Sequence, residues 1–176
     1  MERINTTKAV GATLDYRLDW SAYLGADTIS SVTWTVSGAT GVSASNTTTT
    51  ATQRISGGSA GTTATARCQI TTAAGVVDAR TINIEIVASM TAREVVKSPV
   101  ATIPIPAPTW SDLGGDTIAS YSWSAASGLT IASGGSSATV VVSGGTAGQD
   151  YALTCTITTS AGQIDARVIT VQVRAL

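Results

Sequence analysis

The sequence repeats itself, and this repeat constrains the fold more than any other feature. Sliding the chain over itself by about 87 to 90 residues aligns one half with the other. The matched segments are 20–29 with 110–118, 56–61 with 143–148, 68–72 with 155–159, and 78–80 with 165–167. Trp34 falls on Trp123 in the same alignment. We therefore expect two copies of one domain, at 1–89 and 90–176.

Composition predicts that both copies are built from strands. Thr, Ser, Val, Ile, Ala and Gly dominate, and Phe and His are absent. Apolar and polar residues alternate late in the second copy, where Leu153, Cys155 and Ile157 share one face. Strands are expected near 4–10, 13–19, 28–37, 49–56, 63–72 and 77–88, then near 91–97, 100–106, 117–126, 137–143, 150–159 and 164–174, with 40–46 as a further candidate.

A tryptophan and a cysteine in each copy point to one kind of sandwich. In immunoglobulin-like domains, a Trp of the third strand packs beneath the sheet interface, near a Cys of the sixth strand. Trp34 with Cys68, and Trp123 with Cys155, occupy these places. We therefore predict an all-β chain of two tandem immunoglobulin-like β-sandwich domains, with these four residues in the structural core. Neither copy has the second-strand Cys, so both thiols are expected to be small buried groups. Reactive or metal-binding thiols are the alternative.

The charge content argues against several classes of partner. Only 12% of the residues are charged and the net charge is −1. No basic stripe is available to neutralise phosphates, so we expect no nucleic-acid partner. No stretch approaches the ~20 apolar residues of a membrane span, and the N-terminus lacks the apolar run of a signal peptide. We therefore expect no membrane partner, and synthesis in the cytoplasm of the producing cell.

The residue types argue against catalysis. The absence of His removes the Ser-His-Asp triad, the Cys-His pair and most zinc sites. The acidic residues are scattered singly, without the acidic loop clusters that bind calcium. We therefore predict a protein that is not an enzyme, with no catalytic residue, no metal and no cofactor.

Two charges recur at one end of both copies. Asp27 precedes the strand that contains Trp34, and Arg80 lies near the start of the last strand of the first copy. Asp116 and Arg167 repeat this arrangement around the strand that contains Trp123, which we call, like its counterpart, the Trp strand. Both positions lie at the same end of an immunoglobulin-like sandwich. We predict a half-buried ion pair or network that caps each domain and fixes the loop geometry. The alternative function for these residues is a partner-binding end.

Aromatic residues lie beside the same loops. Trp20, Tyr23 and Trp110 sit in or next to the loop before the Trp strand, among Gly, Ser and Asp residues. An exposed aromatic side chain there would stack on sugar or anchor a protein interface, so these three are candidate binding residues. The alternative interpretation folds them back over the end of the sandwich.

Three strings of the second copy carry a resemblance to a known family. They are Trp-Ser-Asp-Leu-Gly-Gly-Asp-Thr-Ile-Ala-Ser (110–120), followed by Trp123; Ser-Gly-Gly-Thr-Ala-Gly (143–148); and Thr-Thr-Ser-Ala-Gly-Gln-Ile-Asp-Ala-Arg (158–167). The chain resembles the fibre–tail adaptor proteins of tailed bacteriophages over nearly its whole length. The first copy departs from the pattern, with an extra residue near Tyr23 and a longer segment at 38–41.

The resemblance implies a structural protein of the virion, made in the host bacterial cytoplasm. It would attach fibres or spikes to the tail or neck, with other phage structural proteins (tail, neck or fibre subunits) as partners in a symmetric, multi-copy assembly. Unpaired edge strands would be natural docking surfaces. Two alternatives stand beside this function: a capsid decoration protein, and a carbohydrate-binding or adhesin module.

Overall fold

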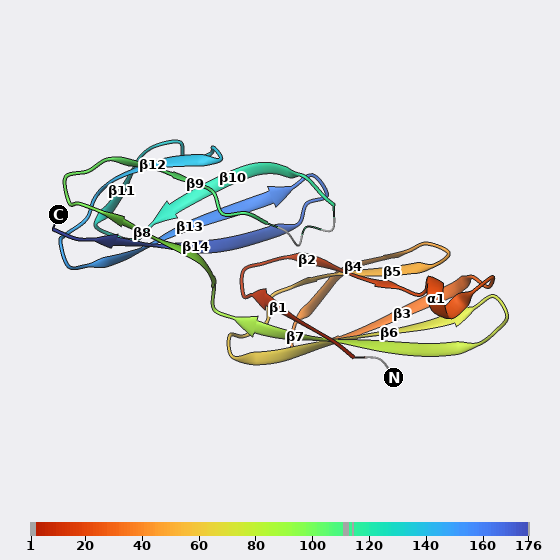
Figure 1. Ribbon diagram of the computed structural model, residues 1–176. Coiled ribbons are helices and arrows are strands. Elements are labelled where there is room, and N and C mark those ends of the chain that lie inside the picture. Colours follow the sequence, from red (N-terminus) through yellow and green to blue (C-terminus); the bar gives the residue numbers. More distant parts are fainter. Residues whose placement is uncertain (1–2, 111–112, 114, 176) are drawn as a thin grey trace. The chain divides into compact units, whose positions relative to one another are not determined.

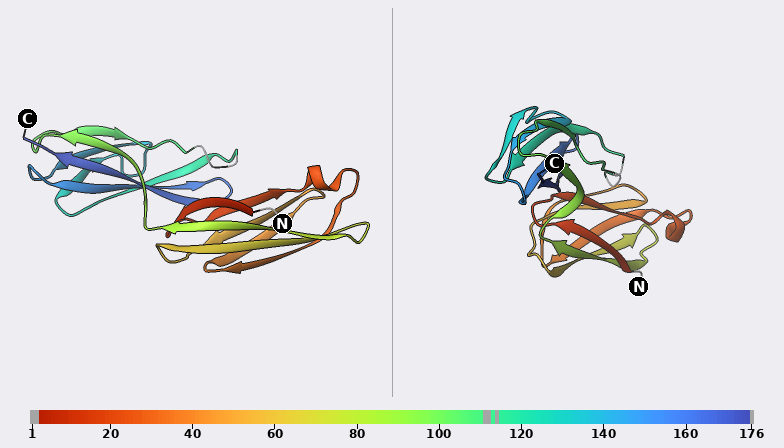
Figure 2. Two further views of the ribbon diagram at one scale, coloured as in Figure 1. Left: turned by 60° about the horizontal axis from the view of Figure 1, so that its bottom comes forward. Right: turned by 60° about the vertical axis from the view of Figure 1, so that its left-hand side comes forward.

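The computed structural model describes residues 3–110, 113 and 115–175 (Figure 1). The chain divides into two compact units, Met1–Ala88 and Ser89–Leu176. Each unit is a sandwich of two β-sheets, which Figure 2 shows from two further directions. The prediction of an all-β chain with two immunoglobulin-like domains is confirmed.

The described residues of the first domain form seven strands and one short helix. The strands are β1 (Arg3–Ala9), β2 (Leu14–Asp19), β3 (Ile29–Ser37), β4 (Thr40–Asn46), β5 (Thr50–Ser56), β6 (Thr62–Thr72) and β7 (Val77–Val87), and the helix α1 is Ser21–Leu24. One sheet has the order β1-β7-β6-β3 and the other β2-β5-β4. The first and last strands, β1 and β7, are parallel, whereas the other pairs are antiparallel.

The second domain repeats this plan without the helix among its described residues. Its strands are β8 (Met90–Lys97), β9 (Ile103–Pro106), β10 (Ile118–Ala125), β11 (Leu129–Ser133), β12 (Thr139–Gly144), β13 (Asp150–Thr159) and β14 (Ile164–Val173). The sheets have the orders β10-β13-β14-β8 and β11-β12-β9, and β8 is parallel to β14. Strand β11 was not expected from the sequence, whereas β4 occupies the candidate segment 40–46.

The core of each domain lies between its two sheets. The alternation in β13 puts Leu153, Cys155 and Ile157 inside, where each is fully buried. Burying a side chain such as Ile157 contributes about 1.5–3 kcal/mol. Cys68 is also fully buried, and both cysteines are free thiols. Burial raises the pKa of Cys68 to about 11 and that of Cys155 to about 12, so neither is a ready nucleophile in the folded protein.

The Trp strands of the two domains differ in how their tryptophans are bound. Trp123 in β10 is buried, and its Nε1 donates a hydrogen bond to Ser137 O at 2.8 Å. The turn between β11 and β12 also accepts from the main-chain N–H of Trp123, at Gly135 O (3.0 Å). Trp34 in β3 is half-buried against the core. Its buried Nε1 has no hydrogen-bond partner within the described residues. The longer β4–β5 hairpin of the first domain therefore gives Trp34 no carbonyl equivalent to the Ser137 O that Trp123 binds.

One lysine is buried at the end of the first strand of each domain. Lys8 in β1 is 0% exposed, and its Nζ donates to three main-chain carbonyls, the nearest being Ala12 O at 2.6 Å. Lys97 in β8 is 2% exposed and also meets three carbonyls, with Gly144 O at 2.6 Å. An ammonium group inside a protein is tolerated when such hydrogen bonds replace water. Gly144 belongs to β12, so Lys97 ties β8 to the opposite sheet.

Candidate functional site

Trp20 is the first residue after β2, at the end of the first domain where the loops lie, and its ring is buried. It directly follows β2, is 0% exposed and belongs to the core cluster. The Arg80 guanidinium lies over the ring, with 4.1 Å from its carbon to the ring centroid. Nη1 of Arg80 donates to Asp19 O at 2.6 Å. Trp20 is therefore not an exposed binding residue; the arginine and the loop seal it against the core.

The second domain builds the same layer around Trp110. This side chain is half-buried, and its Nε1 donates to Asp165 Oδ2 at 3.0 Å. The carbon of the Arg167 guanidinium lies 5.3 Å from the ring centroid, and Nη1 of Arg167 donates to Thr109 O at 2.6 Å. Arg167 Nε also lies 3.7 Å from the buried carboxylate of Asp165. The Asp-Ala-Arg string repeated in both copies thus supplies, in the second domain, two residues that hold the loop tryptophan.

Asp27 connects two loops of the first domain instead of pairing with Arg80. Its Oδ1 accepts from the main-chain N–H of Thr28 at 2.7 Å, and its Oδ2 accepts from that of Ala74 at 3.4 Å. Hydrogen bonds from the Thr72 side chain and from the Thr28 N–H hold the pKa of the Asp27 carboxyl below its ordinary value. The expected ion pair between Asp27 and Arg80 does not form in the described part of the chain. A main-chain donor of the β6–β7 turn binds this carboxylate instead.

Asp116 has the matching role in the second domain. Its Oδ1 accepts from Thr117 N at 2.8 Å and its Oδ2 from Ala161 N at 3.1 Å. A hydrogen bond from the Thr159 side chain is the largest of the influences that lower the pKa of this carboxyl. The expected partner Arg167 binds Thr109 and Asp165 instead. Each aspartate therefore holds the last hairpin turn of its domain in a fixed place.

The fixed turn of the first domain presents apolar side chains to solvent. Val76 and Val77, which follow the turn, are 51% and 56% exposed. Tyr23 in α1 is 43% exposed, and its ring packs edge-on against Trp20 with 5.9 Å between centroids. We call Tyr23, Val76 and Val77 the apolar tip. Of the three aromatic candidates, Tyr23 is the one that the structure leaves accessible, while the two valines were not singled out in the sequence.

The matching turn of the second domain exposes less apolar surface. It carries Gln163, which is buried, and Ile164, which is 37% exposed. The counterpart of α1, at 111–114, lies largely outside the described residues. Among the parts that can be compared, the apolar character is therefore strongest in the first domain.

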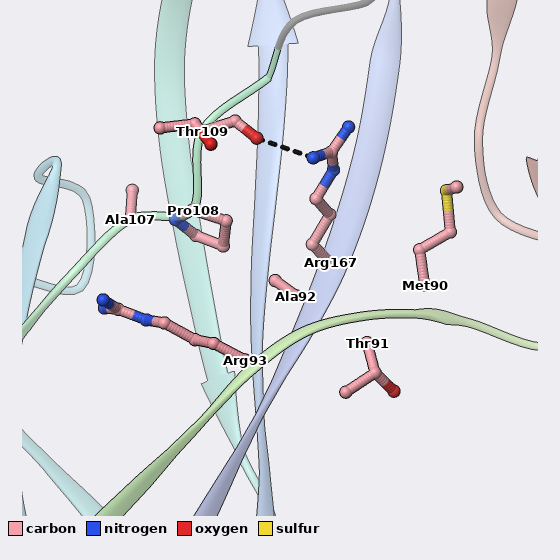
Figure 3. A pocket seen from close by; sticks show the side chains of 8 residues that line it. All are labelled: Met90, Thr91, Ala92, Arg93, Ala107, Pro108, Thr109 and Arg167. Carbon is pink, nitrogen blue, oxygen red and sulfur yellow. Dashed lines mark hydrogen bonds between the residues drawn. The ribbon is translucent and has the colours of Figure 1, made fainter.

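A pocket of about 350 Å³ opens beside Arg167 in the second domain (Figure 3). Arg93 donates from Nη2 to Pro106 O, and Arg167 donates to Thr109 O. The two guanidinium groups extend in different directions, so they do not converge on one point in the pocket (Figure 3). Arg93 therefore links β8 to the last residue of β9, and Arg167 links β14 to the segment that follows β9. The lining consists of Met90, Thr91, Ala92, Arg93, Ala107, Pro108, Thr109 and Arg167.

The described residues include no group of three or more His, Cys, Asp or Glu side chains able to hold a metal ion. No helix in the described ranges is long and apolar enough to cross a membrane.

Three solved structures that resemble the chain have low identity and TM-scores below 0.5. A chimeric titin Z1Z2 functionalised with a decorin peptide is 11% identical, with a TM-score of 0.38, over 98% of this chain and 95% of that chain. DIP-gamma IG1+IG2 is 10% identical, with a TM-score of 0.35, over 100% and 97%. The Bacteroides ovatus protein SGBP-B, in complex with a mixed-linkage heptasaccharide, is 13% identical, with a TM-score of 0.29, over 98% and 43%. No curated protein sequence matches the chain.

One family model matches both domains. It is described as "Podophage GP4 fiber-tail adaptor protein gp77", and it matches residues 8–85 and 97–172. The two matched segments begin at the buried lysines, Lys8 and Lys97, and together they cover nearly the whole chain. The resemblance inferred from the sequence is confirmed: this chain belongs to the podophage GP4 fiber-tail adaptor protein gp77 family.

Proposed function

We propose that this chain is a structural protein of a tailed-phage virion that joins a fibre or spike to the tail or neck, one domain holding each side. The observation that carries the proposal is the family match over both domains. A fibre–tail adaptor needs two binding surfaces, and two domains with differently composed ends supply them. The partners are other phage structural proteins: tail, neck or fibre subunits.

The apolar tip of the first domain is one of these docking surfaces. Tyr23, Val76 and Val77 are exposed at one end of the sandwich, where apolar side chains otherwise favour burial. Asp27 binds the turn next to the valines, so little conformational freedom is lost when a partner covers them. Tyrosine is among the residues that contribute most binding energy at the centre of protein interfaces. We infer that a partner protein with an uncharged, apolar depression receives this tip.

Assembly in the virion also accounts for the low charge of the chain. A surface with few charges resists association poorly, and this is a disadvantage for a protein that stays free. In a particle, the chain is present in several copies arranged by the symmetry of the tail. Synthesis takes place in the host cytoplasm, and the chain then joins the particle.

A phage that lacks the gene for this chain tests the adaptor role. Its particles should have filled heads and tails but no fibres in electron micrographs, and supplying the chain from a plasmid should restore the fibres. Particles that keep their fibres would refute the adaptor role. Loss of density from the capsid faces alone would indicate a decoration protein.

A tip variant tests the docking surface. Val76→Asp with Val77→Asp should abolish complementation, because burying a carboxylate at an apolar interface is unfavourable. Val42→Asp is the control for a carboxylate at an exposed valine outside the tip, since Val42 is 54% exposed but lies in β4; each single tip variant, Val76→Asp or Val77→Asp, matches it in charge. Equal complementation by both variants would remove the tip from the interface. Normal thermal unfolding of the tip variant would show that the defect is in binding.

The carbohydrate-binding alternative is weakened by the positions of the loop tryptophans. Trp20 is inside the core, and the indole N–H of Trp110 is bound to Asp165. Stacking on a sugar needs an accessible ring face. Arg80 lies over the ring of Trp20, and Arg167 lies over the ring of Trp110.

A further inference from the structure

The first and last strands of each domain form a parallel pair. In the first domain, seven residues of β1 pair with β7, from Arg3 with Thr81 to Ala9 with Val87. The main-chain N–H of Val10 extends this pair with a bond to Val87 O at 2.9 Å. The chain therefore enters the domain at one end of the pair and leaves it at the other.

The second domain has the same arrangement. Seven residues of β8 pair with β14, from Met90 with Arg167 to Lys97 with Val173, with one bulge. Arg174 N donates to Lys97 O at 2.9 Å, beyond the last pair. Because both domains belong to one polypeptide, tension between the chain ends passes through β1 and β7 and then through β8 and β14.

This geometry determines how the hydrogen bonds break. Tension pulls the two strands of a parallel terminal pair in opposite directions along their axes, so the bonds of the ladder share the load. If the same strands are pulled apart from one end, the bonds break one after another. Unfolding under force is governed by the unfolding rate, so the shared load makes the domain resistant.

The buried lysines add a second barrier at the far end of each first strand. For β8 to slide along β14, Lys97 must withdraw from Gly144 O in the opposite sheet. In the first domain the carbonyls that Lys8 binds lie one to four residues further along the same segment, so the barrier to sliding of β1 is the displacement of a fully buried ammonium group. Moving an ammonium group through an apolar interior is costly.

We infer that each domain is a tension-bearing unit, in which the parallel pair of first and last strands, closed by a buried lysine, carries the load along the chain. A linker between a tail and a fibre experiences such tension when the fibre moves. The inference rests on the proposed function only for the source of this tension. The mechanical property belongs to the purified chain and is measured without a phage.

Single-molecule pulling of the full chain tests the inference. With handles at the two chain ends, two high-force unfolding events are expected. The second handle is then moved to an Ala161→Cys thiol in the β13–β14 turn, where the side chain is exposed. This handle pulls β8 and β14 apart from the same end, so one of the two high-force events should be lost. The first domain is still loaded between its own ends and is the internal control. Cys68 and Cys155 are buried and do not compete for the handle.

A proline pair tests the ladder itself. The Val10 N–H faces β7, and strand residues alternate in direction, so the Thr6 N–H faces β7 and the Thr7 N–H faces outward. Both threonines are half-buried. Thr6→Pro should lower the unfolding force of the first domain, whereas Thr7→Pro should leave it unchanged.

Two results would overturn the inference. One is an equal unfolding force for the second domain with either handle position, a result that does not depend on any proline variant folding. The other is an equal effect of the two prolines. A phage that keeps its fibres without this chain would refute the adaptor role while leaving these force measurements unchanged.

Discussion

Replacing the core tryptophan with phenylalanine should cost the second domain more than the first. Trp123→Phe removes the hydrogen bond to Ser137 O, which contributes about 1 kcal/mol. Trp34→Phe removes a buried N–H that has no partner within the described residues, and such a group costs about 1–3 kcal/mol. The smaller ring leaves unfilled space in both domains. The second domain should therefore lose at least about 2 kcal/mol more than the first, and 2 kcal/mol corresponds to roughly a 30-fold difference in an opening equilibrium.

The two free cysteines measure each domain separately in the intact chain. Cys68 and Cys155 are fully buried, one in each core, so a thiol reagent reaches them when their own domain opens. Labelling near pH 8, followed by mass spectrometry of the two cysteine peptides, yields both labelling rates from one sample. Each labelling rate is proportional to the opening equilibrium of its own domain when closing is faster than labelling. Trp123→Phe should accelerate labelling of Cys155 about 30-fold more than Trp34→Phe accelerates labelling of Cys68.

Each variant also provides a control for the other. Trp34→Phe should leave the labelling of Cys155 unchanged, and Trp123→Phe should leave that of Cys68 unchanged, since the two cores are separate clusters. If Trp34→Phe destabilises its domain as much as Trp123→Phe does, the buried indole N–H of Trp34 has a partner, and the reasoning is refuted.

Three further predictions concern pH and backbone. Above pH 9 both domains should lose stability, because the unfolded thiol ionises near 9 while burial raises the folded pKa of Cys68 to about 11 and of Cys155 to about 12; Cys→Ala variants should lose this dependence in thermal melts at pH 8 to 11. Gly134→Ala should destabilise more than Gly148→Ala in chemical unfolding: both have positive φ, but only at Gly134 does the added Cβ collide with the main chain of β12. Asp27 has a folded pKa below the usual 3.8, so the stability that its carboxylate contributes is lost as the pH falls from that value through the folded pKa. Asp27→Asn should therefore reduce the loss of stability in acid, measured as the midpoint of thermal unfolding against pH. An unchanged acid profile would contradict this prediction.

The strand pattern of the chain could be read from neighbouring residues. The alternation that places Leu153, Cys155 and Ile157 inside is visible in the sequence, and so are the Gly-containing turns that separate several of the strands. Strand β11 was missed because Leu129–Ser133 is short and has one buried residue, Leu129, so it has little period-2 signal. Its pairing with β12 supplies what its own sequence does not indicate.

The loop ends were harder to predict because their partners are main-chain groups. The sequence placed Asp27 and Arg80 at the same end of the sandwich and suggested that opposite charges would pair. A carboxylate also binds N–H groups, and the turn at Ala74 presents one to Asp27. Arg80 lies over Trp20 and binds the carbonyl of Asp19. Residue types alone do not show which main-chain groups of a hairpin turn will face a neighbouring loop.

The fold class, the repeat and the family follow from the order and periodicity of residues along the chain. The packed domains were needed to show that Trp20 is buried while Tyr23 is exposed, and that Lys97 reaches Gly144. These contacts join residues that are far apart in the sequence. Arg80 and Asp19 are 61 residues apart, and Trp110 and Asp165 are 55 apart, so their contacts exist only after the two sheets have packed together.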